Sequence, residues 1–232
     1  MADDGIDALR PLALLHTAAV NVATFAGLCA ELIPGTPFFH MMDESLLKNT
    51  IADGAMSPRT ARRVVGHIVS AEDAGAGAVL VTCSSIGRAV EIARGGVAIP
   101  VIRVDEAMAD EAVRAGQTVG VIATLPTTLE PTAALVRARA DLAGRSVRIV
   151  THLCAGAFAA LAAGDPARHD ALIADGLRQL MLEVDVVVLA QATMARVADA
   201  LPPADLPRPV PILASPRSGL LRAAEALRSG AA

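Results

Sequence analysis

Cys83 is the residue of this sequence best placed to do chemistry. It lies within residues 81–87 (VTCSSIG), where an apolar run ends and a helix is expected to begin. Unpaired backbone N–H groups and the helix dipole favour negative charge there, so we expect a thiolate with a lowered pKa. Ser84 and Ser85 add hydroxyl donors, and the segment could cradle a carboxylate. The alternative is a small buried hydrophobe followed by serines that cap the helix.

Two further polar clusters follow apolar runs of the chain. In each of them, polar side chains appear where a buried strand is expected to end, so the side chains must find partners or face a cavity. Helix capping and a satisfied amide at the strand end are the alternatives. The clusters are Thr124, Thr127 and Thr128 in the first case, and Gln191, Ala192 and Thr193 in the second.

The remaining cysteines and histidines give weaker signals. Cys29 looks like a core residue of a helix, whereas Cys154 follows a strand and could reach the same cleft as Cys83. The three cysteines are far apart and contain no Cys-x-x-Cys pair, which argues against zinc and favours reduced thiols in a cytosol. His16, His40 and His152 lie near strand ends, where a metal trio or ordinary polar packing is conceivable.

Several classes of protein are disfavoured by composition and motifs. A net charge of −4 without a basic stripe argues against nucleic-acid binding. Residues 11–30 carry no formal charge, but the polar residues within them argue against a membrane span. The acidic start of the chain does not resemble a signal peptide, so we expect a cytoplasmic protein. No Gly-x-Gly-x-x-Gly, Walker or His-Glu-x-x-His motif predicts a nucleotide or zinc site.

Apolar runs and helical stretches alternate along the chain. Continuous apolar runs predict parallel strands buried on both faces, and the alternation predicts an α/β fold. Helices are expected from Asp105 to Ala115, from a Thr127 or Thr128 cap to about Gly144, and from Pro166 to Glu183. The expected strands are 11–15, 37–42, 78–82, 99–104, 119–123, 147–151, 185–190 and 210–213.

The spacing of the strand ends indicates a duplicated unit. His16 lies 67 residues before Cys83, and Thr124 lies 67 residues before Gln191. We therefore expect two pseudo-symmetric, flavodoxin-like halves, residues 1–112 and 113–232. Because ligands bind at the carboxyl ends of parallel strands, an active site is expected in the cleft between them.

At these clusters, and over most of its length, the sequence resembles the aspartate/glutamate racemase superfamily. That superfamily includes hydantoin racemases, maleate isomerases and arylmalonate decarboxylases. Its members offer one cysteine after a buried strand in each half. Cys83-Ser84-Ser85 fits the first cysteine motif, and residues 124–128 match the threonine-bearing loop that opens the second half. Asp43-Glu44-Ser45 resembles an acidic segment near the cleft.

The resemblance implies a cofactor-independent racemase or isomerase that acts on a small carboxylate, either amino-acid-like or a related acid, with Cys83 as acid/base. Where the family places its second cysteine, this chain has Gln191, which cannot exchange protons. One-sided protonation is then expected, unless Cys154 or an acidic residue replaces the second thiol. A single-thiol decarboxylase of the arylmalonate type and a non-catalytic carboxylate-binding protein are the alternatives, and a homo-oligomer is compatible with each. The substrate-binding residues implied are His16, Thr17, Asp43, Ser84, Ser85, Thr124, Thr127, Thr128, Gln191, Ala192 and Thr193.

Overall fold

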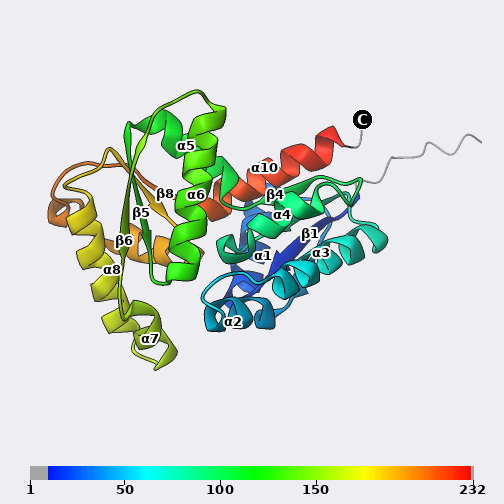
Figure 1. Cartoon of the computed structure of the whole chain (residues 1–232), viewed down its shortest axis with the longest axis horizontal. Coiled ribbons are helices and arrows are strands. Elements are labelled where there is room, and N and C mark those ends of the chain that lie inside the picture. Colours follow the sequence, from blue (N-terminus) through cyan, green and yellow to red (C-terminus); the bar gives the residue numbers. More distant parts are fainter. Residues whose placement is uncertain (1–9, 231–232) are drawn as a thin grey trace, which may run out of the picture.

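The computed structural model describes residues 10–230, which form two four-stranded parallel sheets (Figure 1). The first sheet has the order β2-β1-β3-β4 and the second the order β6-β5-β7-β8, so both follow the flavodoxin-like pattern. The strands are β1 (Leu12–His16), β2 (Phe38–Met42), β3 (Ala78–Val81), β4 (Val101–Arg103), β5 (Thr118–Ala123), β6 (Arg148–Leu153), β7 (Val186–Leu189) and β8 (Ile212–Ala214). The predicted α/β fold with two similar halves is confirmed, and a strand forms in each of the eight expected places.

The central strands are buried on both faces, which explains their uninterrupted apolar runs in the sequence. Every residue of β1, β3 and β7 is buried, because helices cover both faces of each sheet. Uninterrupted apolar runs are the expected signature of such strands.

Helices connect the strands as crossovers. They are α1 (Val20–Leu32), α2 (Glu44–Ala52), α3 (Pro58–Asp73), α4 (Arg88–Ala93), α5 (Glu106–Ala115), α6 (Pro126–Leu142), α7 (Ala157–Ala162), α8 (Pro166–Leu180), α9 (Ala195–Ala200) and α10 (Ser215–Ser229). Three short 3₁₀ helices, η1 (Ser84–Ile86), η2 (Ala192–Met194) and η3 (Pro203–Asp205), complete the chain.

The start of α6 differs from the prediction. Leu125 is the N-cap residue, in an extended conformation, and Pro126 opens the helix, so neither Thr127 nor Thr128 caps it. Proline is preorganised for the first helical position, where its missing N–H costs nothing, and this moves the start ahead of the threonines. Pro131 consequently lies inside the helix. Later in the chain, α8 ends at Leu180, three residues before the expected Glu183.

Two helices are exchanged between the sheets. The apolar residues of α5, including Met108, join the core cluster that contains Val119 of the second sheet. Leu220 of α10 instead joins the cluster around Leu14 of the first sheet, and Figure 1 shows α10 running from the second half along the first. Gly219 permits this packing, since a Cβ there would overlap the carbonyl of Val104. The division of the chain between residues 112 and 113 stays a prediction.

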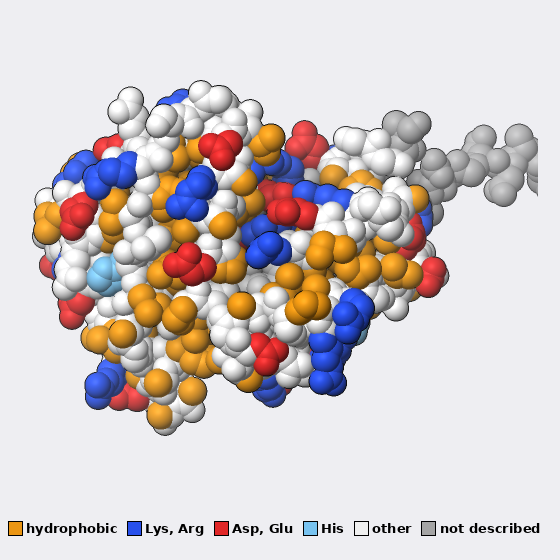
Figure 2. Space-filling view, in the orientation of Figure 1, with side chains coloured by type: hydrophobic (Ala, Val, Ile, Leu, Met, Phe, Trp, Pro, Cys, Tyr) orange, Lys and Arg blue, Asp and Glu red, His pale blue; other side chains and the backbone are white. Residues whose placement is uncertain are grey.

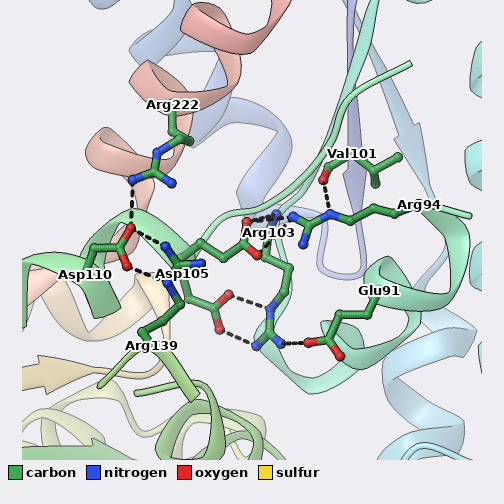
Figure 3. A network of polar contacts seen from close by, with 9 residues as sticks. Glu91, Arg94, Val101, Arg103, Asp105, Asp110, Arg139 and Arg222 are labelled. Atoms are coloured by element: carbon green, nitrogen blue, oxygen red, sulfur yellow. Dashed lines mark hydrogen bonds and ion pairs between the residues drawn. The ribbon is translucent and has the colours of Figure 1, made fainter. Parts of the chain in front are cut away.

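Buried and half-buried ion pairs join the elements where the halves meet (Figure 3). Arg103 of β4 is 2% exposed and donates two hydrogen bonds of 3.0 Å to Asp105. Asp110 of α5 accepts from Arg139 of α6 and from Arg222 of α10. The three helices are thus tied together by one carboxylate.

Charged side chains are otherwise dispersed. Acidic and basic groups are interspersed over most of the face in Figure 2, with hydrophobic side chains exposed among them. Across residues 10–230, we find no helix with the length and apolarity that a bilayer crossing requires.

Candidate active site

A cavity of about 200 Å³ opens between the two halves at the carboxyl ends of their strands. Segments that follow β1, β3, β5 and β7 all contribute to its lining, as the topology requires. Eight of its residues are among those predicted to bind substrate, and Cys83 is a ninth member of the predicted site. These nine are Thr17, Cys83, Ser84, Ser85, Thr124, Thr128, Gln191, Ala192 and Thr193.

Cys83 occupies the turn between β3 and η1. Its backbone is extended (φ −133°, ψ 115°), and Ser84 begins the 3₁₀ helix. The residue lies in the cavity wall and is half-buried. Burial raises the pKa of the Cys83 thiol, and this outweighs the groups that favour the thiolate, which are the side chains of Thr17 and Ser85 and the backbone N–H groups of Ser85 and Ile86.

The expected lowering of the Cys83 pKa is therefore wrong. A 3₁₀ helix of three residues aligns few peptide dipoles, and the protein surrounding the thiol removes the water that would stabilise a thiolate. At neutral pH the group is a thiol, which is the form that donates a proton.

Hydroxyl contacts cross the cleft beside Cys83. Ser85 Oγ lies 2.9 Å from Thr128 Oγ1, and Ser84 Oγ donates to the carbonyl of Ala190 over 3.4 Å. All three hydroxyl-bearing residues are buried. These contacts hold η1 of the first half against α6 and the end of β7 in the second.

Gln191 has a defined orientation. Its Oε1 accepts from the backbone N–H of Thr124 over 2.6 Å and from Thr124 Oγ1 over 3.0 Å. A backbone N–H can only donate, so the amide oxygen must face Thr124 and the amide nitrogen must face away. Among the described residues, Nε2 has no hydrogen-bond acceptor, which leaves its two N–H donors for a ligand.

The two halves place Cys83 and Gln191 at equivalent points. The four residues of β3 and the four of β7 are separated by 108 positions along the chain, as are Cys83 and Gln191. Gln191 precedes η2 with φ −130° and ψ 134°, close to the angles of Cys83 before η1. That Gln191 replaces a family cysteine stays a prediction.

Three predicted binding residues lie outside the cavity lining. His16 is fully buried, with its ring nitrogens 2.8 Å from Thr82 Oγ1 and 2.8 Å from His40 Nδ1. Burial, with a smaller contribution from His40, lowers the pKa of His16 to about 4. Thr127 is also buried, and its hydroxyl has no partner among the described residues. Thr127 does not line the cavity, although Thr128, the next residue of α6, does.

Asp43, the third of these residues, has a structural role. Its carboxylate caps α2 through the N–H of Ser45 and accepts from Arg63 at 2.6 Å and His67 at 2.8 Å. Burial alone would raise the pKa of Asp43, but the hydrogen bonds from Ser45 and His67 and the charge of Arg63 lower it.

The histidine trio does not assemble. His16 and His40 are neighbours on the first sheet, whereas His152 lies on β6 of the second. Among residues 10–230, no three His, Cys, Asp or Glu side chains are grouped as metal ligands. Cys154 is 3% exposed beside α8 and does not line the cavity, and burial raises its pKa to about 11. Cys29 lies in the core, as expected.

Several lining residues were missed by the sequence analysis. Asn21 and His169 lie inside helical stretches, and Ser215 opens α10 directly after β8. The polar Asn21 within an uncharged run was a usable signal, but His169 had none. The apolar wall comprises Val20, Leu47, Leu125, Phe158 and Leu161.

Comparison with known proteins identifies the family of this chain. The sequence pattern of the Asp/Glu/hydantoin racemase family matches residues 17–222, and the chain belongs to that family. No sequence among the curated proteins matches it significantly.

Solved structures of racemases share the fold. Glutamate racemase RacE1 from Bacillus anthracis is 19% identical with a TM-score of 0.74, over 94% of this chain and 82% of that one. Glutamate racemase from Thermus thermophilus, in complex with β-chloro-D-alanine, is 20% identical with a TM-score of 0.71, over 95% of this chain and 81% of that one. Allantoin racemase from Pseudomonas fluorescens is 20% identical with a TM-score of 0.65, over 94% of this chain and 91% of that one. Family membership and this shared fold support an isomerase-type enzyme.

Proposed function

We propose that the protein is a cofactor-independent racemase or isomerase of small carboxylates, in which Cys83 transfers the proton at the carbon next to the carboxyl group. The observation that carries this proposal is the position of Cys83 in the wall of the cavity between the halves, surrounded by hydrogen-bond donors. Removal of an α-proton builds negative charge on the carboxyl group, and donors fixed in a water-poor site stabilise that charge.

The donors are distributed over both halves. Thr17 and the N–H groups at the start of η1 lie on one side, while Gln191 Nε2 and Thr193 lie on the other. A positioned acid/base accelerates proton transfer by about 10²–10⁴-fold, or roughly 3–5 kcal/mol of barrier. The donors and the exclusion of water must supply the remainder of the barrier reduction.

The lining also limits the substrate. No Asp, Glu, Lys or Arg is found among the described residues that line the cavity. An ammonium group would therefore have no carboxylate partner, which disfavours a zwitterionic amino acid. The apolar side chains of Phe158, Leu161 and Val20 favour an acid, or a related carbonyl compound, with an apolar substituent at the reacting carbon.

The proposal is tested by proton exchange in heavy water. Enantiomers of aspartate, glutamate, allantoin and 2-phenylpropionate are incubated with the protein, and deuterium at the reacting carbon is measured by mass spectrometry. We expect exchange with at least one compound, and we expect Cys83→Ala to slow racemisation by about 10²-fold or more. Absence of exchange with all of them would contradict the proposal.

The neutral amide of Gln191 favours a second candidate, a single-thiol decarboxylase of the arylmalonate type. In that reaction the substrate loses CO₂, and the thiol of Cys83 protonates the resulting enediolate from one face. Release of CO₂ from phenylmalonate without exchange of 2-phenylpropionate would select this function. An unreactive Cys83 together with tight binding of the acids would instead select a non-catalytic binding protein.

A further inference from the structure

We propose that His169 is the second acid/base of this site and acts on the face of the substrate opposite Cys83. This inference rests on the proposed function. Cys83 and His169 are the titratable side chains among the described residues that line the cavity, and they come from different halves of the chain. Racemisation needs a proton carrier on each face of the reacting carbon, and the cavity offers these two.

The other replacements for a second thiol are placed elsewhere. Cys154 is buried outside the lining, and Asp43 is held by Arg63 and His67. Glu44 forms an exposed ion pair with Lys48. None of the three belongs to the cavity wall.

His169 is held in a defined tautomer. It lies on α8 with 1% of its surface exposed, and its Nδ1 is 2.8 Å from Oδ1 of Asp170. The hydrogen bond from Arg196 lowers the pKa of Asp170, and the hydrogen bond from His169 adds to this, so the carboxylate is ionised and can only accept. Nδ1 must therefore carry a hydrogen, and Nε2 is the ring nitrogen that can accept or release a proton.

The structure leaves Nε2 available. Among the described residues, Nε2 has no hydrogen-bond partner. The buried side-chain atoms that lack a partner there are the hydroxyl oxygens of Thr127 and Thr132, so Nε2 is not fully enclosed. His169 is almost wholly buried and is one of the residues that line the cavity, so we infer that Nε2 is reached from the cavity.

Asp170 is itself oriented. Arg196 donates two hydrogen bonds of 2.6 Å to its carboxylate, one to each oxygen. Arg196 lies in α9, directly after the η2 segment that Gln191 precedes. The helix that follows η2 thus orients the ring of His169 through Asp170, whereas Thr124 orients the amide of Gln191. Asp170 and Arg196 are positioning residues.

The proton balance of the step is complete. Nε2 of neutral His169 removes the α-proton as the C–H bond breaks, and the electron pair enters the enediolate. The thiol of Cys83 then gives its proton to the opposite face. The enzyme is left with an imidazolium and a thiolate, which is the protonation state needed for the reverse direction, and exchange with water restores the starting state.

The proposal replaces the one-sided protonation expected from the sequence, and it predicts a face-specific effect. Wild-type protein should exchange the α-proton of both enantiomers of an accepted compound. His169→Asn retains an N–H toward Asp170 but cannot carry a proton, so racemisation should fall by about 10²-fold or more. At a pH high enough to ionise the Cys83 thiol, the variant should still exchange one enantiomer with retention of configuration, and Cys83→Ala should exchange only the other. His152→Asn, which changes a histidine beside the same helix α8 but outside the lining, is the matched control.

A labelling experiment tests the access of Nε2 without turnover. Bromoacetate is applied to Cys83→Ala, and alkylated histidines are mapped by mass spectrometry. Nε2 of His169 should displace bromide and become carboxymethylated, and 2-phenylpropionate should protect it. Labelling of the more exposed His40 and His67 without His169 would contradict the proposal.

The outcomes separate the two proposals. If wild type exchanges none of the compounds, the proposed function fails and the role of His169 fails with it. If wild type racemises a compound and His169→Asn does so within about twofold of that rate, only the assignment of His169 is overturned. Equal loss of exchange with both enantiomers in folded His169→Asn protein would also overturn it, since a base on one face must affect one enantiomer more.

Discussion

Replacement of Gly87 by alanine should destabilise the protein, although the position looks favourable for alanine. Gly87 has helical angles (φ −58°, ψ −33°) at the end of η1, and a helical Gly→Ala change is worth about 1 kcal/mol of stabilisation. A Cβ there would lie 2.5 Å from Cζ of Arg103 and 2.6 Å from its Nε. The guanidinium must therefore move.

The cost of that movement depends on how firmly Arg103 is held. An exposed arginine would shift at little cost, but this one is 2% exposed and is bonded twice to the fully buried Asp105, with Glu91 3.5 Å away (Figure 3). Disrupting a buried ion pair costs about 3–5 kcal/mol. After the gain of about 1 kcal/mol from the backbone, the free energy of unfolding should fall by roughly 2–4 kcal/mol.

Urea unfolding followed by circular dichroism measures this change, since the chain has no Trp or Tyr. At a slope of about 2 kcal/mol per molar, the midpoint should fall by roughly 1–2 M. Gly66→Ala is the matched control, because Gly66 lies within α3 and a Cβ there meets nothing within 4 Å. That variant should be more stable than wild type by about 0.5–1 kcal/mol.

A double-mutant cycle identifies the cause. If the collision with Arg103 is responsible, Gly87→Ala should cost much less in an Arg103→Met background than in wild type. Equal stabilisation by Gly87→Ala and Gly66→Ala would refute the reasoning. Because Gly87 directly follows the helix that begins after Cys83, the variant should also slow alkylation or exchange at Cys83.

Three further predictions concern titration and the cavity. Iodoacetamide should modify Cys83 before the buried Cys29 and Cys154. Because the pKa of Cys83 is raised, its labelling rate should keep rising with pH through 9. A plateau below pH 8, measured by mass spectrometry at fixed reaction times, would contradict this. The pKa of His16 is lowered to about 4, so its contribution to stability is complete above about pH 6.5 and declines toward pH 4. Urea unfolding at pH 7 and at pH 4.5 should show a loss of up to about 3 kcal/mol in the free energy of unfolding, and His16→Asn should reduce that loss. An unchanged loss in the variant would disprove this prediction. Gln191→Glu should weaken the binding of acids about tenfold by charge repulsion, as measured by calorimetry, and tighter binding would contradict the donor role of Gln191. Gln191→Cys in a His169→Asn background should raise the racemisation rate about tenfold above that of His169→Asn alone.

The strands were accessible from the sequence because burial on both faces leaves uninterrupted apolar runs. Val186–Leu189 and Ala78–Val81 carry this signal plainly. The match between Cys83 and Gln191 was also accessible, since a duplicated unit repeats its spacing along the chain. The start of α6 was less so, because Thr127 and Thr128 are good capping residues by type and only the preceding Pro126 shows that the helix has already begun.

Local sequence could not decide which polar residues face the cavity. His16 and Thr17 are adjacent, yet the first bonds His40 and Thr82 inside the protein while the second lines the cavity. Successive residues at a strand end point in different directions, and the partners of His16 lie 24 and 66 positions away. The pKa of Cys83 likewise depends on tertiary contacts. The surrounding protein excludes water and raises the pKa, and this outweighs the helix that follows in the sequence.

The sequence by itself determined the fold class and the two similar halves, and it singled out Cys83 as the candidate thiol, because these depend on local periodicity and on spacing along the chain. Only the tertiary structure placed a second titratable side chain in the same cavity wall as that thiol. His169 lies within a helix and looks unremarkable in the sequence, and it reaches the cavity because α8 packs beside the end of the second sheet. Asp170 and Arg196 then orient its ring through contacts between two helices, which no spacing along the chain reports.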